Sequence, residues 1–285
     1  PMTRSVRDAA MILDAIAGTD PEDPWSEDAD EHVTDYVAAL DADALRGTRV
    51  GVLRSTGPGA EEVDPLFDAA LDVLTAEGAE LVELPVDALV DPRPEMRIIL
   101  LQDFKVDLDA DLETTPSAVT VRTLADLMEF SRTDPRESMH TMDYWEDAQA
   151  TENGRSNATY QEALANGRRL TRDDGIDRLL QEYDVDVLVS PTGTPASEIE
   201  PDGTPRAGPI PAGPRGTRPP GLTVVAAVAG YPLISVPMGL VGGLPVGITF
   251  ASTAWTEAQL LGLAYDYEQA SQARVPPDRA LTQGR

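Results

Sequence analysis

The chain has 285 residues, with 50 Asp and Glu against 22 Lys and Arg, which gives a formal net charge of −28 at pH 7. A surface this acidic repels nucleic-acid phosphates and anionic lipids, so we expect neither nucleic acid nor a membrane as a partner. Cysteine is absent, which excludes disulfides, thiol nucleophiles and thiolate metal sites.

The acidic excess, with Lys105 as the single lysine, indicates a halophilic protein from a high-salt cytoplasm. Salt screens the self-repulsion there, because the Debye length is only about 3 Å at 1 M salt. The alternative is that the acidic surface binds a cationic partner. No apolar signal segment follows Pro1, which favours a cytoplasmic location. A start at Pro1 predicts either that Met2 is the true start or that the sequence is a fragment of a longer protein.

An amphipathic helix is predicted near the beginning of the chain. Ser5 is a candidate N-cap and Gly18 marks the end, and the apolar residues between them recur three and four positions apart: Val6, Ala9, Ala10, Leu13, Ile16 and Ala17. A short helix is then expected over residues 36–45.

The next segment has the pattern of a βαβ unit, with a strand, a helix and a strand over residues 49–54, 64–77 and 79–84. Gly57 and Gly59 lie in the first turn, where a dinucleotide-binding motif would begin. Glu62 replaces the third glycine of that motif, and its carboxylate would repel a pyrophosphate. We therefore expect no nucleotide here.

The middle of the chain is predicted to be mainly helical and to end in a strand. Thr123 is the expected cap of one helix, and breaks are expected near Gly154 and Gly175. The predicted helical stretches, followed by the strand, cover residues 95–112, 123–130, 143–183 and 184–191. The segment 198–221 is rich in proline and glycine, and we expect a long loop there.

The longest apolar region, residues 223–252, is interrupted by Pro232, Pro237 and Pro245, which excludes a membrane-spanning helix. Its short apolar runs instead predict a helix, a strand, a hairpin turn at Gly242–Gly243 and a second strand. The helix and the two strands are expected over residues 224–229, 233–237 and 246–251.

The titratable residues offer little catalytic chemistry by themselves. His32 and His140 are far apart in the sequence and flanked by acids, so they support neither a Ser-His-Asp triad nor a zinc site, and both are expected at the surface. Lys105 is expected to be a solvated or ion-paired helix lysine. We assign no catalytic residue and no metal ligand.

Several segments together resemble the amidase signature hydrolases. The carboxy-terminal block of that family is similar to residues 229–239, 243–250, 255–261 and 267–270. Residues 1–6 and 16–24 are similar to the family segment that directly follows the catalytic loop. The run from Phe104 to Leu108 is similar to the branch that includes bacterial peptide amidases, and it differs from the amidotransferase A subunits.

The resemblance implies an α/β fold, a mixed β-sheet covered by helices, in which the amino-terminal part of the family fold is missing. It implies one domain over residues 1–285, with the loop 198–221 inside it. In the family, the strand that matches residues 184–191 delivers a loop to the wall of the substrate cleft. Thr192 and Thr194 follow that strand, so they are candidate substrate-binding residues, although an ordinary turn is the alternative.

The implied reaction is hydrolysis of a carboxylic amide to a carboxylate and ammonia or an amine, through a serine, a second serine and a lysine. This sequence has no Ser-Ser dipeptide and no lysine besides Lys105. The catalytic residues are therefore expected upstream of this chain, which should be inactive alone. No metal or organic cofactor is implied, and the expected partners are a small-molecule amide and an upstream amidase segment.

Two alternatives stay open. The chain could be a non-catalytic remnant or binding module of the same fold, or it could resemble an amidotransferase A subunit that needs partner subunits. Under the fragment hypothesis, uncovered sheet edges should cause self-association or aggregation.

Overall fold

The computed structural model describes residues 1–54, 59–137, 142–196 and 221–276, which form two compact units. The described part of the first unit comprises residues 1–54, 59–90, 171–196 and 221–276, and that of the second comprises residues 91–137 and 142–170. His140 and all of the predicted loop 198–221 except Gly221 lie outside the described residues. The single domain over residues 1–285 stays a prediction.

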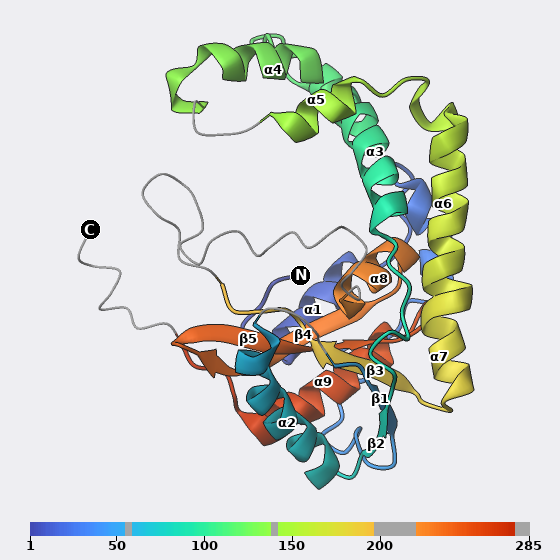
Figure 1. The fold of residues 1–285 in the computed structure, drawn as a ribbon, viewed down its shortest axis with the longest axis vertical. Helices are drawn as coiled ribbons and strands as arrows, with labels where there is room; N and C mark the ends of the chain where they lie inside the picture. The colour runs from blue at the N-terminus through green and yellow to red at the C-terminus, as the bar shows by residue number, and fades with distance from the viewer. Residues whose placement is uncertain (55–58, 138–141, 197–220, 277–285) are drawn as a thin grey trace, which may run out of the picture. The chain divides into compact units, whose positions relative to one another are not determined.

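The first unit is built on a five-stranded mixed sheet with the order β2-β1-β3-β5-β4 (Figure 1). Strands β1 and β2 are parallel, β3 is parallel to β1, and β5 is antiparallel to both β3 and β4. This arrangement confirms the predicted α/β class with a mixed sheet. The strands are β1 (Arg49–Val52), β2 (Glu80–Glu83), β3 (Val187–Pro191), β4 (Leu233–Val241) and β5 (Leu244–Ala251).

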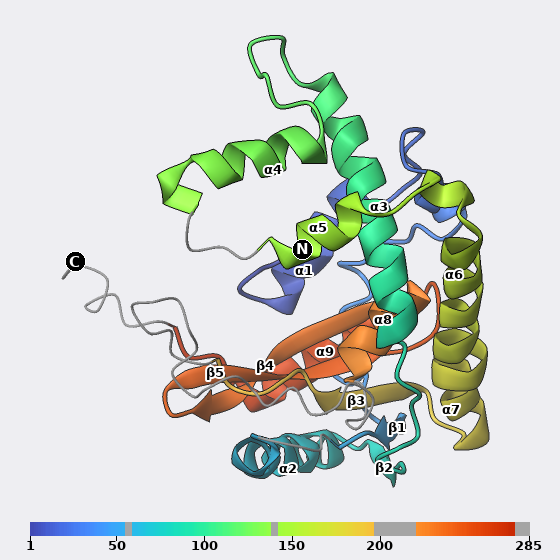
Figure 2. The ribbon, with the colours of Figure 1, turned by 45° about the horizontal axis from the view of Figure 1, so that its top comes forward.

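Helices cover both faces of this sheet. On one face, α1 (Val6–Ile16), α2 (Ala60–Ala76) and α9 (Glu257–Ser271) share the larger apolar core. On the other face, α7 (Asp177–Glu182) and α8 (Leu222–Ala229) form a second core with Leu188 and Ala251. Figure 2 shows α2 and α8 on opposite sides of the strands.

Local sequence signals explain where several elements begin and turn. Ser5 caps α1 as predicted, because its Oγ accepts the Asp8 N–H at 3.1 Å. The predicted β4–β5 turn is confirmed, and Gly242 and Gly243 adopt φ values of +57° and +85° that few other residues tolerate. Both strands of this hairpin are longer than the sequence predicted.

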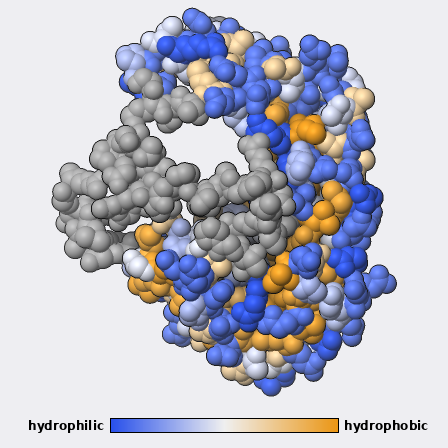
Figure 3. All heavy atoms as spheres, in the orientation of Figure 1, coloured by the Kyte–Doolittle hydropathy of each residue, from blue (hydrophilic) through white to orange (hydrophobic). Residues whose placement is uncertain are grey.

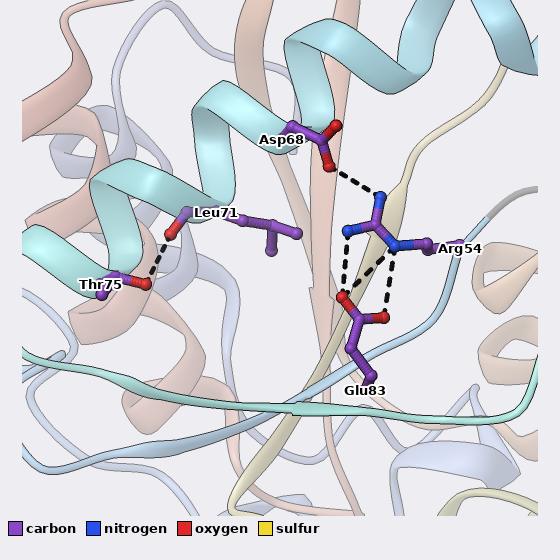
Figure 4. Close-up of polar contacts among 5 residues, drawn as sticks. All are labelled: Arg54, Asp68, Leu71, Thr75 and Glu83. Atoms are coloured by element: carbon purple, nitrogen blue, oxygen red, sulfur yellow. Dashed lines mark hydrogen bonds and ion pairs between the residues drawn. The ribbon is translucent and has the colours of Figure 1, made fainter.

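Arg54 fastens the βαβ unit together, as Figure 4 shows. Its guanidinium donates to Asp68 of α2 at 2.8 Å and to Glu83 at the end of β2 at 3.0 Å. The hydrogen bond with Glu83 contributes most to raising the pKa of Arg54. In the same helix, the Thr75 hydroxyl donates to the Leu71 carbonyl at 3.0 Å and is thereby satisfied within α2.

The second unit is helical throughout its regular structure, with helices α3 (Arg93–Thr114), α4 (Leu124–Thr133), α5 (Asp143–Gln149) and α6 (Ala158–Thr171). Its apolar core is small and centres on Leu124, Met128 and Ala148. Thr123 caps α4 as predicted and forms a capping box with Asp126. Most of the surface of α3 to α5 visible in Figure 3 is hydrophilic.

Short helical turns fill several connections. They are 3-10 turns η1 (Pro24–Ser26), η2 (Ala29–Glu31), η3 (Pro135–Glu137) and η4 (Gly154–Ser156), and a π-helical turn η5 (Arg172–Ile176). The predicted helix breaks are confirmed, since Gly154 has a φ of +50° and Gly175 has non-helical dihedrals of −113° and −110°. Within the described residues, no helix is both long and apolar enough to cross a membrane.

The predicted helix over residues 36–45 is wrong, because this segment forms consecutive turns. Aspartate side chains take backbone donors that a helix would use. The Asp41 carboxylate accepts the Asp43 N–H at 3.0 Å, and the Asp266 carboxylate accepts the Leu45 N–H at 2.9 Å. Such bonds compete with helical ones.

The strand predicted over residues 184–191 begins three residues late, at Val187. Asp184 lies in the left-handed region with a φ of +50°, and Asp186 accepts the Arg49 N–H at 2.8 Å through its side chain. Tyr183 and Asp184 form the turn after α7, and Asp186 bonds Arg49 of β1 with both its side chain and its N–H, so the regular strand begins only at Val187.

Two carboxylates of α9 hold distant backbone segments in place. Asp266, only 2% exposed, accepts the Leu45 N–H at 2.9 Å, and Glu268 accepts the Val6 N–H at 3.0 Å. Burial raises the pKa of both carboxyl groups, and Glu77 and Asp43 add repulsion at Asp266. The folded state therefore binds these protons more tightly than the unfolded state does.

This sign predicts how stability changes with pH. The contribution of Asp266 is fully present below its unfolded-state pKa and is lost as the pH rises through the higher folded-state pKa. Asp266→Asn keeps an oxygen for the Leu45 N–H and removes the charge, so we expect a flatter profile and no loss of stability at neutral pH. Urea unfolding between about pH 4 and about pH 8 measures this. A profile as steep as that of the parent would contradict the prediction.

Candidate functional site

Three hydroxyl groups form a row across one face of the sheet. Thr192 follows β3 directly, Thr249 lies on β5 and Ser235 lies on β4. The Thr249 Oγ1 is 2.8 Å from the Thr192 Oγ1 and 2.8 Å from the Ser235 Oγ. We call Thr192, Thr249 and Ser235 the hydroxyl row.

The register of the strands creates the hydroxyl row. Ser235 and Thr249 are directly paired across β4 and β5. Thr192 continues the β3–β5 pairing by one step, where its N–H donates to the Gly247 carbonyl at 2.7 Å. Side chains two apart on one strand share a face, so Thr192 reaches Thr249 diagonally.

Gly247 gives the row the space it needs. A Cβ atom there would lie 2.9 Å from the Val236 carbonyl oxygen and 3.0 Å from the Thr192 Oγ1. Both distances are shorter than an ordinary van der Waals contact. The absence of a side chain at this position therefore permits the Thr192 hydroxyl to lie over β5.

The two predicted site residues have different environments. Thr192 is exposed and belongs to the hydroxyl row. Thr194 is half-buried, and its Cγ2 would be 3.0 Å from a Cβ at Gly59, the residue before α2. The structure thus brings Thr192, but not Thr194, together with two hydroxyls that the sequence analysis did not select. Their substrate-binding role stays a prediction.

Ser235, at one end of the row, also lines a cavity of about 640 Å³ in the first unit. The residues before α1, the first half of β4 and one side of α9 line it. Its polar lining includes Arg4, Ser5, Ser235, Glu257 and Glu268. A cavity of this volume, apolar with a few polar groups, has the size of a small-molecule site.

The hydroxyl row can hydrogen-bond a ligand, but no activating base contacts it among the residues that the structure describes. Its described contacts are hydroxyl to hydroxyl, and a serine or threonine nucleophile needs a neighbouring base. His32 is exposed, as predicted, and its ring stacks on that of Trp255 at a centroid distance of 3.9 Å. In the described ranges, no group of three or more His, Asp or Glu residues could hold a metal ion.

Lys105 lies on α3 in the second unit. The sequence predicted a solvated or ion-paired lysine, but the structure shows its ammonium bound to backbone carbonyls. Its Nζ donates to the carbonyls of Gln149 and Thr151 at 3.0 Å each. These carbonyls lie at and just beyond the C-terminal end of α5, where a cation is favourable. Lys105 therefore fastens α5 to α3.

Substitution of Gly247 tests the packing of the hydroxyl row. We expect Gly247→Ala to lower the free energy of unfolding by about 1–3 kcal/mol, because the new methyl group overlaps Val236 and Thr192. The matched control is Gly193→Ala, since nothing lies within 4 Å of a Cβ there. Urea unfolding of both variants measures the difference. Equal effects at the two positions would show that Gly247 is not under steric constraint.

Comparison with known proteins places these features in a family. The family model described as Amidase matches residues 1–261. An Arabidopsis thaliana protein named "Probable amidase" is 29% identical over 97% of this chain and 49% of its own length. The A subunit of the glutamyl-tRNA(Gln) amidotransferase of Caldanaerobacter subterraneus subsp. tengcongensis is 30% identical over 97% of this chain and 55% of its own length.

Solved structures agree with the sequence matches. The native peptide amidase from Stenotrophomonas maltophilia superposes with a TM-score of 0.81 and 36% identity, covering 98% of this chain and 54% of that one. The chain thus spans about half the length of the relatives it matches. Because the family model covers most of the sequence and the sheet matches that of a solved amidase, the chain belongs to the amidase signature family.

Proposed function

We propose that this chain is part of an amidase that hydrolyses a carboxylic amide to a carboxylate and ammonia or an amine. The match of the Amidase family model to residues 1–261 is the observation that carries the proposal. The resemblance to a peptide amidase at 36% identity supports an amide as the substrate class. The cavity beside Ser235 offers a volume of about 640 Å³ for such a ligand.

The catalytic groups belong to polypeptide outside residues 1–285 in this proposal. The sequence has no adjacent pair of serines and one lysine. That lysine, Lys105, is engaged by two backbone carbonyls. Among the described residues no base contacts the hydroxyl row, so in this proposal the row would orient the substrate through hydrogen bonds while an upstream amidase segment supplies the serine, second serine and lysine.

That segment would pack where the sheet is open. Strand β4 ends the strand order, and its exposed residues include Leu233 and Leu240. An open strand edge with apolar side chains favours pairing with another chain, which also supports the predicted self-association when the chain is alone.

Membership of a multi-subunit complex is a second candidate function. It rests on the 30% identity to an amidotransferase A subunit over 97% of this chain. In that case the partners would be other subunits of a complex, and the chain alone would again be inactive. A cytoplasmic location and adaptation to high salt stay proposals that rest on the acidic composition.

Ammonia release from simple amides in about 1 M KCl tests the proposal, at a salt concentration that screens the acidic surface. We expect no turnover by the folded chain alone. Turnover should appear when the chain is co-expressed with the amino-terminal half of a bacterial peptide amidase. Release by the chain alone that is lost in Lys105→Ala would overturn the assignment of the catalytic groups to another segment.

The same assay tests the two threonines. In the complemented enzyme, Thr192→Val and Thr194→Val should each lower kcat/KM by about threefold to tenfold, the effect of one lost hydrogen bond. Thr133→Val on α4 is the matched control, because its exposed hydroxyl bonds only to its own helix at Glu129 and Phe130. Unchanged kinetics in both variants would remove Thr192 and Thr194 from the site.

A further inference from the structure

The first helix of the chain, α1, presents apolar side chains on more than one side. The buried side faces the larger core of the first unit through Val6, Ala9 and Ala10. The solvent side carries three large apolar residues that are 56%, 40% and 65% exposed, namely Met11, Ile12 and Ile16. A surface helix normally has polar residues on its solvent side, and a helix that is apolar all round is normally buried all round. We call Met11, Ile12 and Ile16 the α1 patch.

The acidic surface of the chain is interrupted around α1. Residues 1–19 contain two arginines, Arg4 and Arg7, and two aspartates, Asp8 and Asp14, so their side-chain charges sum to zero, against −28 for the whole chain. Charged residues are depleted at the centres of protein interfaces, because removing a charge from water is unfavourable. This stretch therefore combines exposed apolar side chains with little charge that a partner would have to desolvate.

The α1 patch adjoins the cavity of about 640 Å³. Ala9 and Leu13 of α1 line that cavity. Residues three and four positions apart on a helix are neighbours, so Ile12 and Ile16 lie beside these two residues. Leu233 of β4 also lines the cavity and is itself exposed. Uncovered apolar surface thus extends from the outside of α1 through the cavity to the first half of β4.

The size of α1 discriminates between a second copy of the chain and a larger partner. The helix has 11 residues, so it is about 16 Å long. Two copies that met along α1 alone would bury far less than the roughly 1,200–2,000 Å² of a stable interface. A stable complex therefore needs a partner that also covers the cavity and the first half of β4. The relatives contain additional polypeptide of that extent, because this chain spans about half of their length.

We propose that the α1 patch and the adjoining cavity are the docking surface for the upstream amidase segment. An apolar face of that segment packs against Ile12 and Ile16 and continues into the cavity. The inference rests on the proposed function, and it identifies the surface through which the two segments associate. The open edge of β4 then lies at the border of the interface, and α1 lies nearer to its centre.

Co-purification tests the proposal. The full chain carries an affinity tag and is co-expressed with the amino-terminal half of the Stenotrophomonas maltophilia peptide amidase, in about 1 M KCl during purification to screen the acidic surface. We expect the two polypeptides to elute together in a one-to-one ratio. Ile16→Asp introduces a charge that the complex must desolvate, so it should lower the co-purified amount at least about tenfold.

Val86→Asp is the matched control, because Val86 is also an exposed apolar residue of the first unit and lies outside the α1 patch. This variant should co-purify like the parent. Urea unfolding of the chain alone shows whether Ile16→Asp is folded, and Met11→Asp replaces it if it is not. The proposal is overturned if no complex forms, or if the α1 variants co-purify as well as Val86→Asp.

Hydrolysis is measured separately, by ammonia release from the same preparations. A complex that depends on the α1 patch but shows no turnover would contradict the proposed function and leave the docking surface standing. Turnover that is equal in the parent and in Ile16→Asp, with equal co-purification, would overturn the docking surface and leave the proposed function standing.

Discussion

The first unit depends on the burial of β3. All five of its residues, Val187–Pro191, are buried, and it hydrogen-bonds to β1 on one side and β5 on the other. A strand without a solvent-exposed face must satisfy its backbone groups through such pairing. This requirement aligns three segments that are far apart in the sequence. It also places Thr192 beside Gly247 and Thr249.

Arginine organises the charges of this acidic chain. Arg54 joins α2 to β2, and Arg155 joins η4 to two carboxylates of α3. A planar guanidinium with five donors can hold two carboxylates at once, which a compact ammonium does less well. These pairs are partly exposed, so each contributes at most about 1 kcal/mol and is weakened by salt. Their role is to set geometry rather than to provide most of the stability.

The described residues provide a scaffold with hydrogen-bonding groups, but their contacts do not include the base that amide hydrolysis needs. The sheet, the cavity beside Ser235 and the hydroxyl row provide hydrogen-bonding surfaces. A proton-accepting partner for those hydroxyls is absent from the contacts described. Since fold alone does not establish activity, the catalytic proposal goes beyond the family membership from which it starts.

The sequence by itself determined the features that depend on near neighbours. The caps at Ser5 and Thr123, the Gly242–Gly243 turn and the βαβ unit all follow from residues a few positions apart. The same local rules failed over residues 36–45, because the carboxylates of Asp41 and Asp266 bind backbone N–H groups that the helical pattern had assigned to a helix. The resemblance to the amidase signature family could also be recognised from the sequence, because several segments match the family in the same order along the chain.

Only the tertiary structure decided which polar groups meet. Ser235 and Thr249 lie in apolar strands that the sequence presents as core, and Thr192 and Thr249 are 57 positions apart. Their contact follows from strand register and from the missing side chain at Gly247. Lys105 likewise appears in the sequence as an ordinary helix residue. Its two carbonyl partners at the C-terminal end of α5 are more than forty positions away, and only the packing of α5 against α3 brings them within hydrogen-bond distance.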